Sequence, residues 1–545
     1  MVKNLLALLS SRQNSILSGA VVLMATVFAS KFLGLIRDRM LAHFFVPDEL
    51  AVFFAAFRVP DLLFQLLIFG AVSVAFIPVF TDFLNKKGDK EAFTFASDVL
   101  NIVLVGFIAV CIIVFLLAGN FIGLIVPGFN EAQKEETVNL TRIILGGQII
   151  LVIGSFLTGI SQSFQRFIIP AIASFFYNVG IILGIIFLVP LWGIAGPAVG
   201  VTLGASLYVV IQIPLVVSLG FRHTLTFNFK SNGIREVLGL MSIRTVGVAV
   251  EQLNETVGVI LASLISASSV TFLTFAQHLQ TVPIGLFGAT LAQAALPVLS
   301  REKSRGEDGS FKVTLLTAMH QIMFLALPAA AILIVLRIPA VRLVFGASQF
   351  NWEATVLTGK TVAFLSVGLA AQAIALLLVR SFYALKDTRT PVIVSILSVS
   401  LNVTLSFYFV QNLHLEVWGL GASYAISSNF AFLLLLYFLH HKVGGFNLND
   451  LFMPTLKMLL AAVVAAVALY IPIKALDQLV FDTTHTINLI LLTGIASIFG
   501  LGVYLLLVWL LKVRELETFG QLIRRIYKFK FELKSEEIVQ HPDTV

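Results

Sequence analysis

Long apolar stretches alternate with short polar segments along almost the whole chain. A membrane-spanning helix needs about 20 mainly apolar residues, and about fourteen stretches reach that length. The pattern predicts an all-α, polytopic membrane protein, with bends at Pro60 and Pro283 inside the second and eighth stretches. The stretches lie near residues 16–43, 49–82, 94–118, 136–160, 168–190, 196–219, 236–265, 269–300, 313–336, 354–381, 391–411, 418–440, 453–476 and 486–511.

Sequence landmarks recur at a period of about 220 residues, which predicts two related lobes. Matching stretches are separated by an even number of crossings, so the lobes would be parallel, related by an axis along the membrane normal. We expect six-helix lobes at 1–230 and 231–450, an appended helical hairpin at 451–513 and a basic tail at 514–545. The landmark pairs are Gln165–Pro170 with Lys386–Pro391, Trp192–Gly196 with Trp418–Gly421, and Pro78 with Pro297.

Composition and charge narrow the class of protein further. A chain that is 58% hydrophobic and 12% charged, with a net charge of +7, lies outside the range of soluble globular proteins. Its basic residues gather in the loops of one side, which predicts cytoplasmic termini and contact with anionic lipid heads, and they form no basic face for nucleic acid. The single cysteine, Cys111, excludes an internal disulfide.

No catalytic or cofactor-binding motif stands out in the sequence. It contains no nucleotide-binding loop, nucleophile elbow or cluster of metal ligands, so we expect neither an enzyme nor a cofactor. The tail segment 521–534 alternates apolar and basic residues. That alternation suits either a basic helix at the membrane interface or a solvated tail.

Charged side chains interrupt the first apolar stretch at Lys31, Arg37 and Asp38. At 100° per helical residue, these three fall within a sector of about 120°, whereas Arg39 points elsewhere. A charge at membrane depth costs roughly 2.5–3.5 kcal/mol and normally faces a bundle interior or a wet cavity. This face predicts a cationic cavity; the alternative is an Arg37–Asp38 pair that reaches the outer interface.

Other polar side chains lie inside later stretches of both predicted lobes. Arg244 and Glu251 share a helix face, so they form either an internal ion pair or part of a site. His278 is either a hydrogen-bonded core histidine or part of a wet face. Excess positive charge suits an anionic head such as a diphosphate. The candidate substrate-binding residues are Lys31, Arg37, Asp38, Arg58, Gln65, Arg244, Glu251, Asn254, Gln277 and His278.

Several sequence blocks resemble the MurJ (MviN) family of lipid II flippases in the MOP exporter superfamily. The resemblance implies alternating-access transport of a lipid-linked peptidoglycan precursor to the outer leaflet of the bacterial plasma membrane. It also implies that Lys31, Arg37 and Arg58 hold the diphosphate, and that envelope-synthesis proteins are partners. The matching blocks are Ser30–Asp38, Ala55–Leu63, Gln252 with Asn254, Leu261–Ser263, Pro283–Gly288 and Leu296–Ser300.

The chain also departs from this family at charged positions. Family members that bind sodium do so with an Asn and an Asp one turn apart, where this chain has Asn402 and Ser406, so a sodium site is not expected. The alternative functions are export of another polyprenyl-diphosphate glycan or of an amphipathic substrate, or a scaffold without transport. Many members have an Asp where Ala51 stands, an Arg pair at Phe64-Gln65, an acid at Phe69 and Asp-Arg at Gln277-His278.

Overall fold

The computed structural model describes residues 16–69, 75–228, 231–479, 485–517 and 519–520. Every regular element in these residues is a helix, so the predicted all-α fold is confirmed. The chain divides into two compact units, each of which combines separate segments of sequence. The predicted basic tail segment 521–534 lies outside the described residues.

Unit 1 comprises Met1–Val282, Ala340–Gly368 and Arg389–Ala431. Its helices are α2 (Ile16–Phe44), α3 (Pro47–Phe64), α4 (Ile77–Lys87), α5 (Asp89–Leu116), α6 (Ala118–Ile125), α7 (Glu131–Ser163), α8 (Ile168–Trp192), α9 (Ala195–Val210), α10 (Ile213–Ser218), α11 (Asn232–Ile265), α12 (Ala267–Pro283), α16 (Trp352–Val367) and α18 (Arg389–Phe407). The π-helical segments η1 (Gln65–Phe69) and η4 (Tyr408–Asn412) continue α3 and α18.

Unit 2 comprises Pro283–Pro339, Leu369–Thr388 and Phe432–Val545. Its helices are the π-helical segment η3 (Ile284–Ala289), then α13 (Thr290–Ser304), α14 (Asp308–Val335), α17 (Leu369–Ala384), α20 (Leu448–Leu479) and α21 (Thr486–Leu510). Two further helices, α15 (Arg337–Phe345) and α19 (Trp418–Lys442), contribute residues to both units.

The described helices are long and apolar enough for a multi-pass membrane protein. Among the described residues, 12 helices could cross a membrane, or 13 if α16 and α17 form one span. The other expected stretch, 16–43, coincides with the 29-residue helix α2. The count of about fourteen spans therefore stays a prediction, as do the lobe boundaries and the axis that would relate the lobes.

The order of the elements repeats along the chain at the expected period of about 220 residues. Helices α5 and α14 each have 28 residues and each begin with an aspartate. Helices α7 and α16 each begin after an asparagine cap, Asn130 or Asn351, whose side chain accepts from a backbone N–H. Each of the turns before α8 and α18 contains a residue with positive φ, Gln165 at 59° and Lys386 at 57°.

Pro60 interrupts the backbone hydrogen bonding of α3 without ending the helix. Helix α3 continues past Pro60 to Phe64 before the π-helical segment begins. Proline has no N–H to donate to the carbonyl four residues earlier, which here belongs to Ala56. The hydroxyl of Thr141 on α7 donates to that carbonyl at 3.2 Å. A neighbouring helix thus satisfies the carbonyl, and Arg58 and Asp61 stay on one helix on either side of Pro60.

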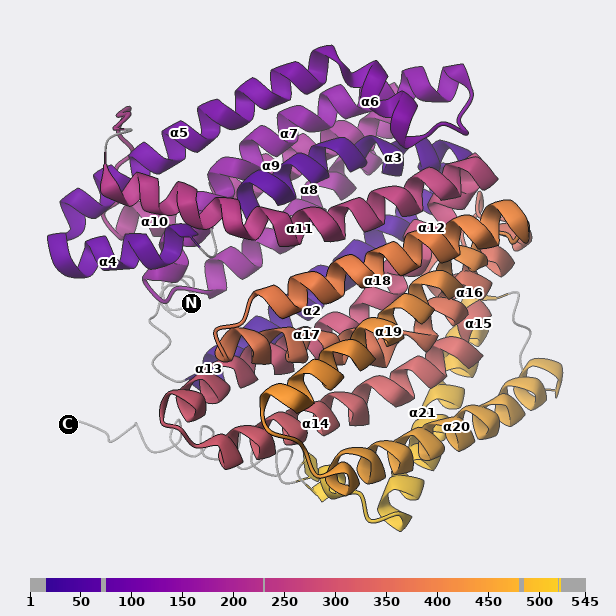
Figure 1. Ribbon diagram of the computed structural model, residues 1–545. Helices are drawn as coiled ribbons and strands as arrows, with labels where there is room; N and C mark the ends of the chain where they lie inside the picture. Colours follow the sequence, from indigo (N-terminus) through magenta and orange to yellow (C-terminus); the bar gives the residue numbers. More distant parts are fainter. Residues whose placement is uncertain (1–15, 70–74, 229–230, 480–484, 518, 521–545) are drawn as a thin grey trace, which may run out of the picture. The chain divides into compact units, whose positions relative to one another are not determined.

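Glycines allow α8 and α9 to pack backbone against backbone in unit 1 (Figure 1). A Cβ atom on Gly180 would lie 2.2 Å from the Cα of Gly204, and one on Gly184 would lie 2.5 Å from the Cα of Gly200. Small residues at such contacts are typical of membrane helices, where close van der Waals packing drives association. The contact fixes the part of α8 that carries Asn178.

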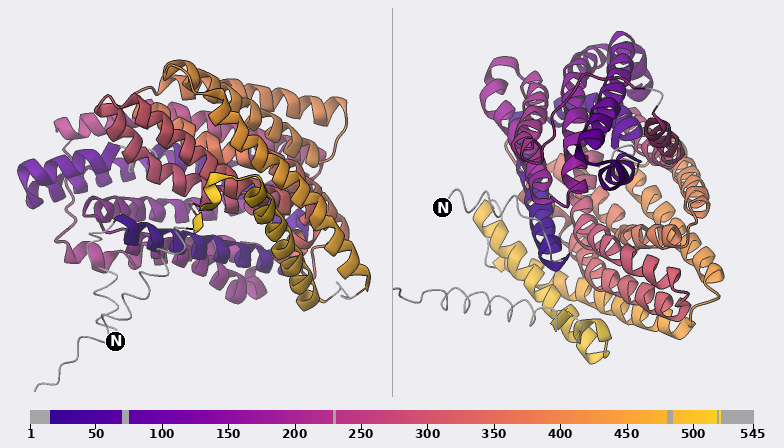
Figure 2. Two further views of the ribbon diagram at one scale, coloured as in Figure 1. Left: turned by 90° about the horizontal axis from the view of Figure 1, so that it is seen from below. Right: turned by 90° about the vertical axis from the view of Figure 1, so that its left-hand side faces the viewer.

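The helices at the end of unit 2 form a hairpin, α20 with α21, that packs on α14 (Figure 2). The buried hydroxyl of Tyr504 on α21 donates to the carbonyl of Phe324 on α14 at 3.1 Å. Further along, His320 Nδ1 lies 3.5 Å from Glu515 Oε1, and both side chains are buried. Polar contacts therefore attach the last described residues of unit 2 to α14.

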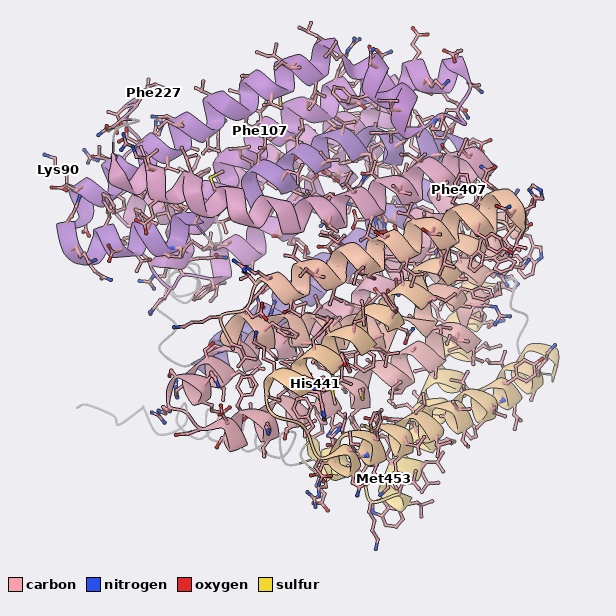
Figure 3. All side chains as sticks on the ribbon, in the orientation of Figure 1. Lys90, Phe107, Phe227, Phe407, His441 and Met453 are labelled. Carbon is pink, nitrogen blue, oxygen red and sulfur yellow. The ribbon has the colours of Figure 1, made fainter. Side chains whose placement is uncertain are left out.

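Large apolar side chains remain exposed on many of these helices. Phe407 on α18 and Met453 on α20 are each 56% exposed, whereas Phe107 on α5 is 2% exposed (Figure 3). Exposed apolar faces on helices of this length are the surfaces that contact lipid. The chain is therefore a multi-pass membrane protein.

Substitution of Gly180 by alanine should destabilise unit 1. The added methyl group has to displace the backbone of α9, and overpacking of this kind typically costs about 1–3 kcal/mol. The measurement is the thermal midpoint of the purified protein in detergent. The control is Gly106→Ala on α5, where a Cβ atom would meet nothing within 4 Å. Equal midpoints for the two variants would contradict the glycine contact.

Candidate functional site

Four side chains in unit 1 form a hydrogen-bonded group around the buried carboxylate of one of them, Asp38. We call this group the Asp38 cluster: Arg37, Asp38, Asn178 and His278. Arg37 donates to Asp38 Oδ1 from Nε at 2.9 Å and from Nη2 at 2.7 Å. Its Nη1 donates to Asn178 Oδ1 on α8 at 3.1 Å. His278 Nδ1 on α12 lies 2.7 Å from Asp38 Oδ2. Asp38, 1% exposed, thus joins α2 to α12, while Arg37 joins α2 to α8.

A second group, the Arg58 clamp, consists of Arg58 on α3 with Gln252, Glu255 and Thr256 on α11. The guanidinium donates to Glu255 Oε2 at 3.0 Å, to Gln252 Oε1 at 2.8 Å and to Thr256 Oγ1 at 3.3 Å. Glu255 and Thr256 follow Gln252 on α11 by three and four residues, so one helix face presents all three acceptors. The Arg58 side chain is 13% exposed, and Glu255 is 45% exposed. Arg58 therefore holds α3 against α11.

Asp61 connects these two groups electrostatically. Its Oδ1 accepts a hydrogen bond from Gln148 Nε2 on α7 at 2.8 Å. It lies within electrostatic reach of Arg58, of Glu255 and also of Arg37. The Asp38 cluster and the Arg58 clamp therefore belong to one charged network on α2, α3, α11 and α12.

The other predicted site residues lie at the edge of this network or outside it. Lys31 is exposed on α2, within electrostatic reach of Arg37 and Asp38, and none of the described ion pairs includes it. Gln65 begins η1 and Gln277 precedes His278 on α12; both are half-buried. Arg244 lies on α11, but its side chain is outside the described residues.

Helix α11 also carries a neutral polar group, the Asn402 cluster: Asn254, Asn402, Ser406 and Ser423. Asn402 Nδ2 donates to Asn254 Oδ1 at 2.7 Å, and Ser406 Oγ lies 3.5 Å from Asn402 Oδ1. Ser406 and Ser423 share a hydrogen bond of 2.5 Å. The group offers amide and hydroxyl oxygens without a carboxylate, and these oxygens already pair with one another. The group therefore lacks the Asn–Asp pair expected for a sodium site.

The formal charges of the described network do not sum to a positive value. Ionised side chains at membrane depth are stable when partners neutralise them, and both arginines have carboxylate partners here. Carboxylates of the same network therefore pair with the arginines, and the excess of positive charge expected at the site stays a prediction, because the side chain of Arg244 lies outside the described residues. The cations are Lys31, Arg37 and Arg58, and the carboxylates are Asp38, Asp61 and Glu255; Glu251, exposed on α11, lies within electrostatic reach of Glu255.

Some residues of the network were not predicted from the sequence, notably Asn178, Gln148 and Thr256. Asn178 and Gln148 are single amides inside long apolar stretches. An isolated amide at membrane depth needs a hydrogen-bonding partner, so its position was a usable signal. The sequence does not reveal which residue is that partner, because Asn178 and Arg37 are 141 positions apart in the chain.

Comparison with known proteins finds one family and one fold. The family model described as lipid II flippase MurJ matches residues 40–491. A probable lipid II flippase MurJ from Buchnera aphidicola subsp. Schizaphis graminum is 27% identical over 511 residues, which cover 91% of this chain and 97% of the relative.

Two solved structures share the fold. Lipid II flippase MurJ in an inward closed conformation has a TM-score of 0.74 and 24% identity, and the match covers 89% of this chain and 98% of that one. An inward-facing multidrug resistance MATE family transporter of the MOP superfamily has a TM-score of 0.66 and 15% identity, over 78% of this chain and 98% of that one.

Sodium should have no specific effect on this protein, because the Asn402 cluster lacks a carboxylate. The thermal midpoint of the purified protein should be the same in sodium chloride and in potassium chloride at equal ionic strength. As a positive control, Asn254→Asp combined with Ser406→Asp supplies two carboxylates at the same place. A higher midpoint in sodium for the unsubstituted protein would show that the cluster binds the ion.

Proposed function

The chain belongs to the MurJ family of lipid II flippases, and on this premise we propose that it moves lipid II from the inner to the outer leaflet by alternating access. The substrate is lipid-linked and its surroundings are membrane lipids. No bond of the substrate is made or broken in this step, so the chain acts as a transporter and not as an enzyme.

The observation that carries the proposal is the set of unused donors around the Asp38 cluster. A guanidinium has five N–H donors, and Arg37 directs three of them at Asp38 and Asn178. Lys31 is exposed nearby. Charge-assisted bonds from lysine and arginine suit the oxygens of a diphosphate. Asp38 then serves to orient the Arg37 guanidinium, and the remaining donors bind the substrate.

Arg58 contributes in a different way, because α11 already occupies its donors. Its bonds to Gln252 and Glu255 would have to open before the guanidinium could reach a diphosphate. We therefore assign Arg58 to the exchange between two conformations. In one it holds α3 against α11, and in the other it binds the substrate.

The distribution of basic residues supports an orientation with both termini in the cytoplasm. Lys86 and Lys87 end α4, and Lys90 follows at the start of α5, where its side chain projects away from the helices (Figure 3). Such clusters normally remain on the cytoplasmic side and contact anionic lipid heads. This side also faces the proteins that supply a lipid-linked precursor, and we propose that envelope-synthesis proteins are partners there.

Complementation tests the function directly. The chain should restore growth to bacteria depleted of their own lipid II flippase, and lipid II should reach the outer leaflet of those cells. Growth without lipid II export would favour a scaffold. Export of a different polyprenyl-diphosphate glycan, together with failure to complement, would show that the substrate is not lipid II.

Substitutions of Arg37 test the site. Arg37→Lys keeps the charge but loses the planar fork, whereas Arg37→Ala loses both, including a charge-assisted bond worth about 1.5–3 kcal/mol. Flipping per folded molecule should therefore fall in the order unsubstituted, Arg37→Lys, Arg37→Ala. The measurement is a flipping assay in vesicles, normalised to the amount of folded protein.

The matched control for these variants is Arg39→Ala. Arg39 lies on the same helix, and its Nη1 donates to the carbonyl of Leu343 on α15 at 2.6 Å, outside the Asp38 cluster. Loss of this bond should lower the amount of folded protein more than flipping per molecule. Equal flipping by Arg37→Ala and Arg39→Ala would remove Arg37 from the substrate site.

A further inference from the structure

His278 is the histidine of the Asp38 cluster, and its imidazole contacts the buried Asp38 carboxylate. Histidine is the side chain that normally gains or loses a proton between about pH 5 and 8. His278 has its Nδ1 2.7 Å from Asp38 Oδ2, and its side chain is 33% exposed, whereas that of Asp38 is 2% exposed. The imidazole thus has one edge on a buried carboxylate and part of its surface open.

The carboxylate determines which ring nitrogen carries the proton. An ionised carboxylate only accepts hydrogen bonds, so the Nδ1 that faces Asp38 must be the donor. The neutral imidazole then has a bare lone pair on Nε2. A phosphate oxygen is repelled by this lone pair but accepts a strong hydrogen bond from a protonated Nε2. His278 can therefore hold an anion only after a second proton has bound.

The charged groups around His278 come from α2, α3 and α8, and Asp61 on α3 lies within electrostatic reach of Arg37. The charged groups nearby on α2 are Asp38 and Arg37, with Lys31 within reach of both. On α8, Tyr177 interacts with Arg37. From α3 the ring of Phe54 meets the imidazole edge to face, with centroids 6.0 Å apart, and it carries no charge.

The position of His278 along its helix supports a role toward the substrate. His278 stands as many positions after Ala267, the first residue of α12, as Arg58 stands after Pro47, the first residue of α3. Helix α3 therefore has the permanently charged Arg58 at the position where helix α12 has His278. Each pairs with a carboxylate on a helix from the other half of the chain, Glu255 for Arg58 and Asp38 for His278.

We infer that His278 is a proton-binding site coupled to the substrate, so that binding of a diphosphate takes up one proton from water at Nε2. This inference rests on the proposed function, because it requires an anionic head at the Asp38 cluster. The proton adds one positive charge to the Arg37, Asp38 and His278 group. Substrate affinity should therefore fall as the pH rises, by up to about tenfold for each unit.

Calorimetric titration of the full-length protein in detergent with purified lipid II tests the inference. Both phosphates of a disubstituted diphosphate stay ionised from about pH 5.5 to 8.5, so the titrating group belongs to the protein. Two buffers with different protonation enthalpies give the number of protons taken up. We expect an uptake that approaches one proton at the upper end of this range, and a dissociation constant that rises with pH.

Two substitutions distinguish this inference from other origins of a pH effect. His278→Arg, with a permanent charge, should bind lipid II with no proton uptake and no pH dependence. His223→Gln is the control, since His223 bonds to Asn101 away from the network and its loss should leave the uptake unchanged. Should His278→Arg fail to fold, His278→Gln replaces it: without a proton site at Nε2 it should bind lipid II with no proton uptake, and an unchanged uptake would overturn the inference.

Each outcome has a separate meaning. An unsubstituted protein that binds lipid II without proton uptake, or a His278→Arg variant with the same uptake, overturns the proton site and leaves the proposed function standing. Failure of the folded, unsubstituted protein to bind lipid II at any pH overturns the proposed function itself.

Discussion

The high cost of an isolated charge at membrane depth governs the arrangement of this protein. Arg37, Asp38 and Arg58 lie on helices that are otherwise apolar, and each has a partner of opposite charge. Removal of one partner from a buried pair typically costs about 3–5 kcal/mol, because it leaves the other charge uncompensated. The pairs therefore constrain which helices can be neighbours. In unit 1 they join α2 to α12 and α3 to α11, and amide side chains from α7 and α8 complete the same network.

The pairing of both arginines with carboxylates bears on what a transport site requires. A site that binds an anion strongly in its resting state would release it slowly, and an unpaired cluster of cations would be costly without substrate. Here Asp38 and Glu255 occupy part of the donor capacity of Arg37 and Arg58. A substrate at the proposed site would compete with carboxylates that are already in place, which would limit its affinity and allow its release.

The apolar pattern of the sequence predicted the helical membrane fold, because each membrane-spanning stretch can be recognised from its own length and composition, without knowledge of how the helices pack. The same is true of the charged face of α2, where helical geometry alone places Lys31 with Arg37 and Asp38. The partners of these residues could not be predicted. Asn178 and His278 are far away in sequence, and a choice between them and other polar side chains depends on packing. Asp38 is next to Arg37 in the sequence and was recognisable there as a partner, whereas only the fold brings Glu255 of α11 to Arg58.

The cross-pairing of Arg58 with Glu255 and of His278 with Asp38 has a consequence for the inheritance of this chain. Each half of the sequence contributes one acid and one base to these two pairs, although Asp38 also pairs with Arg37 in its own half. A change of charge at Arg58 or Glu255 must therefore be matched in the other half, whereas Asp38 keeps Arg37 as a partner. A chimaera that takes its first half from one relative and its second from another would succeed only where the two parents carry complementary charges at these four positions.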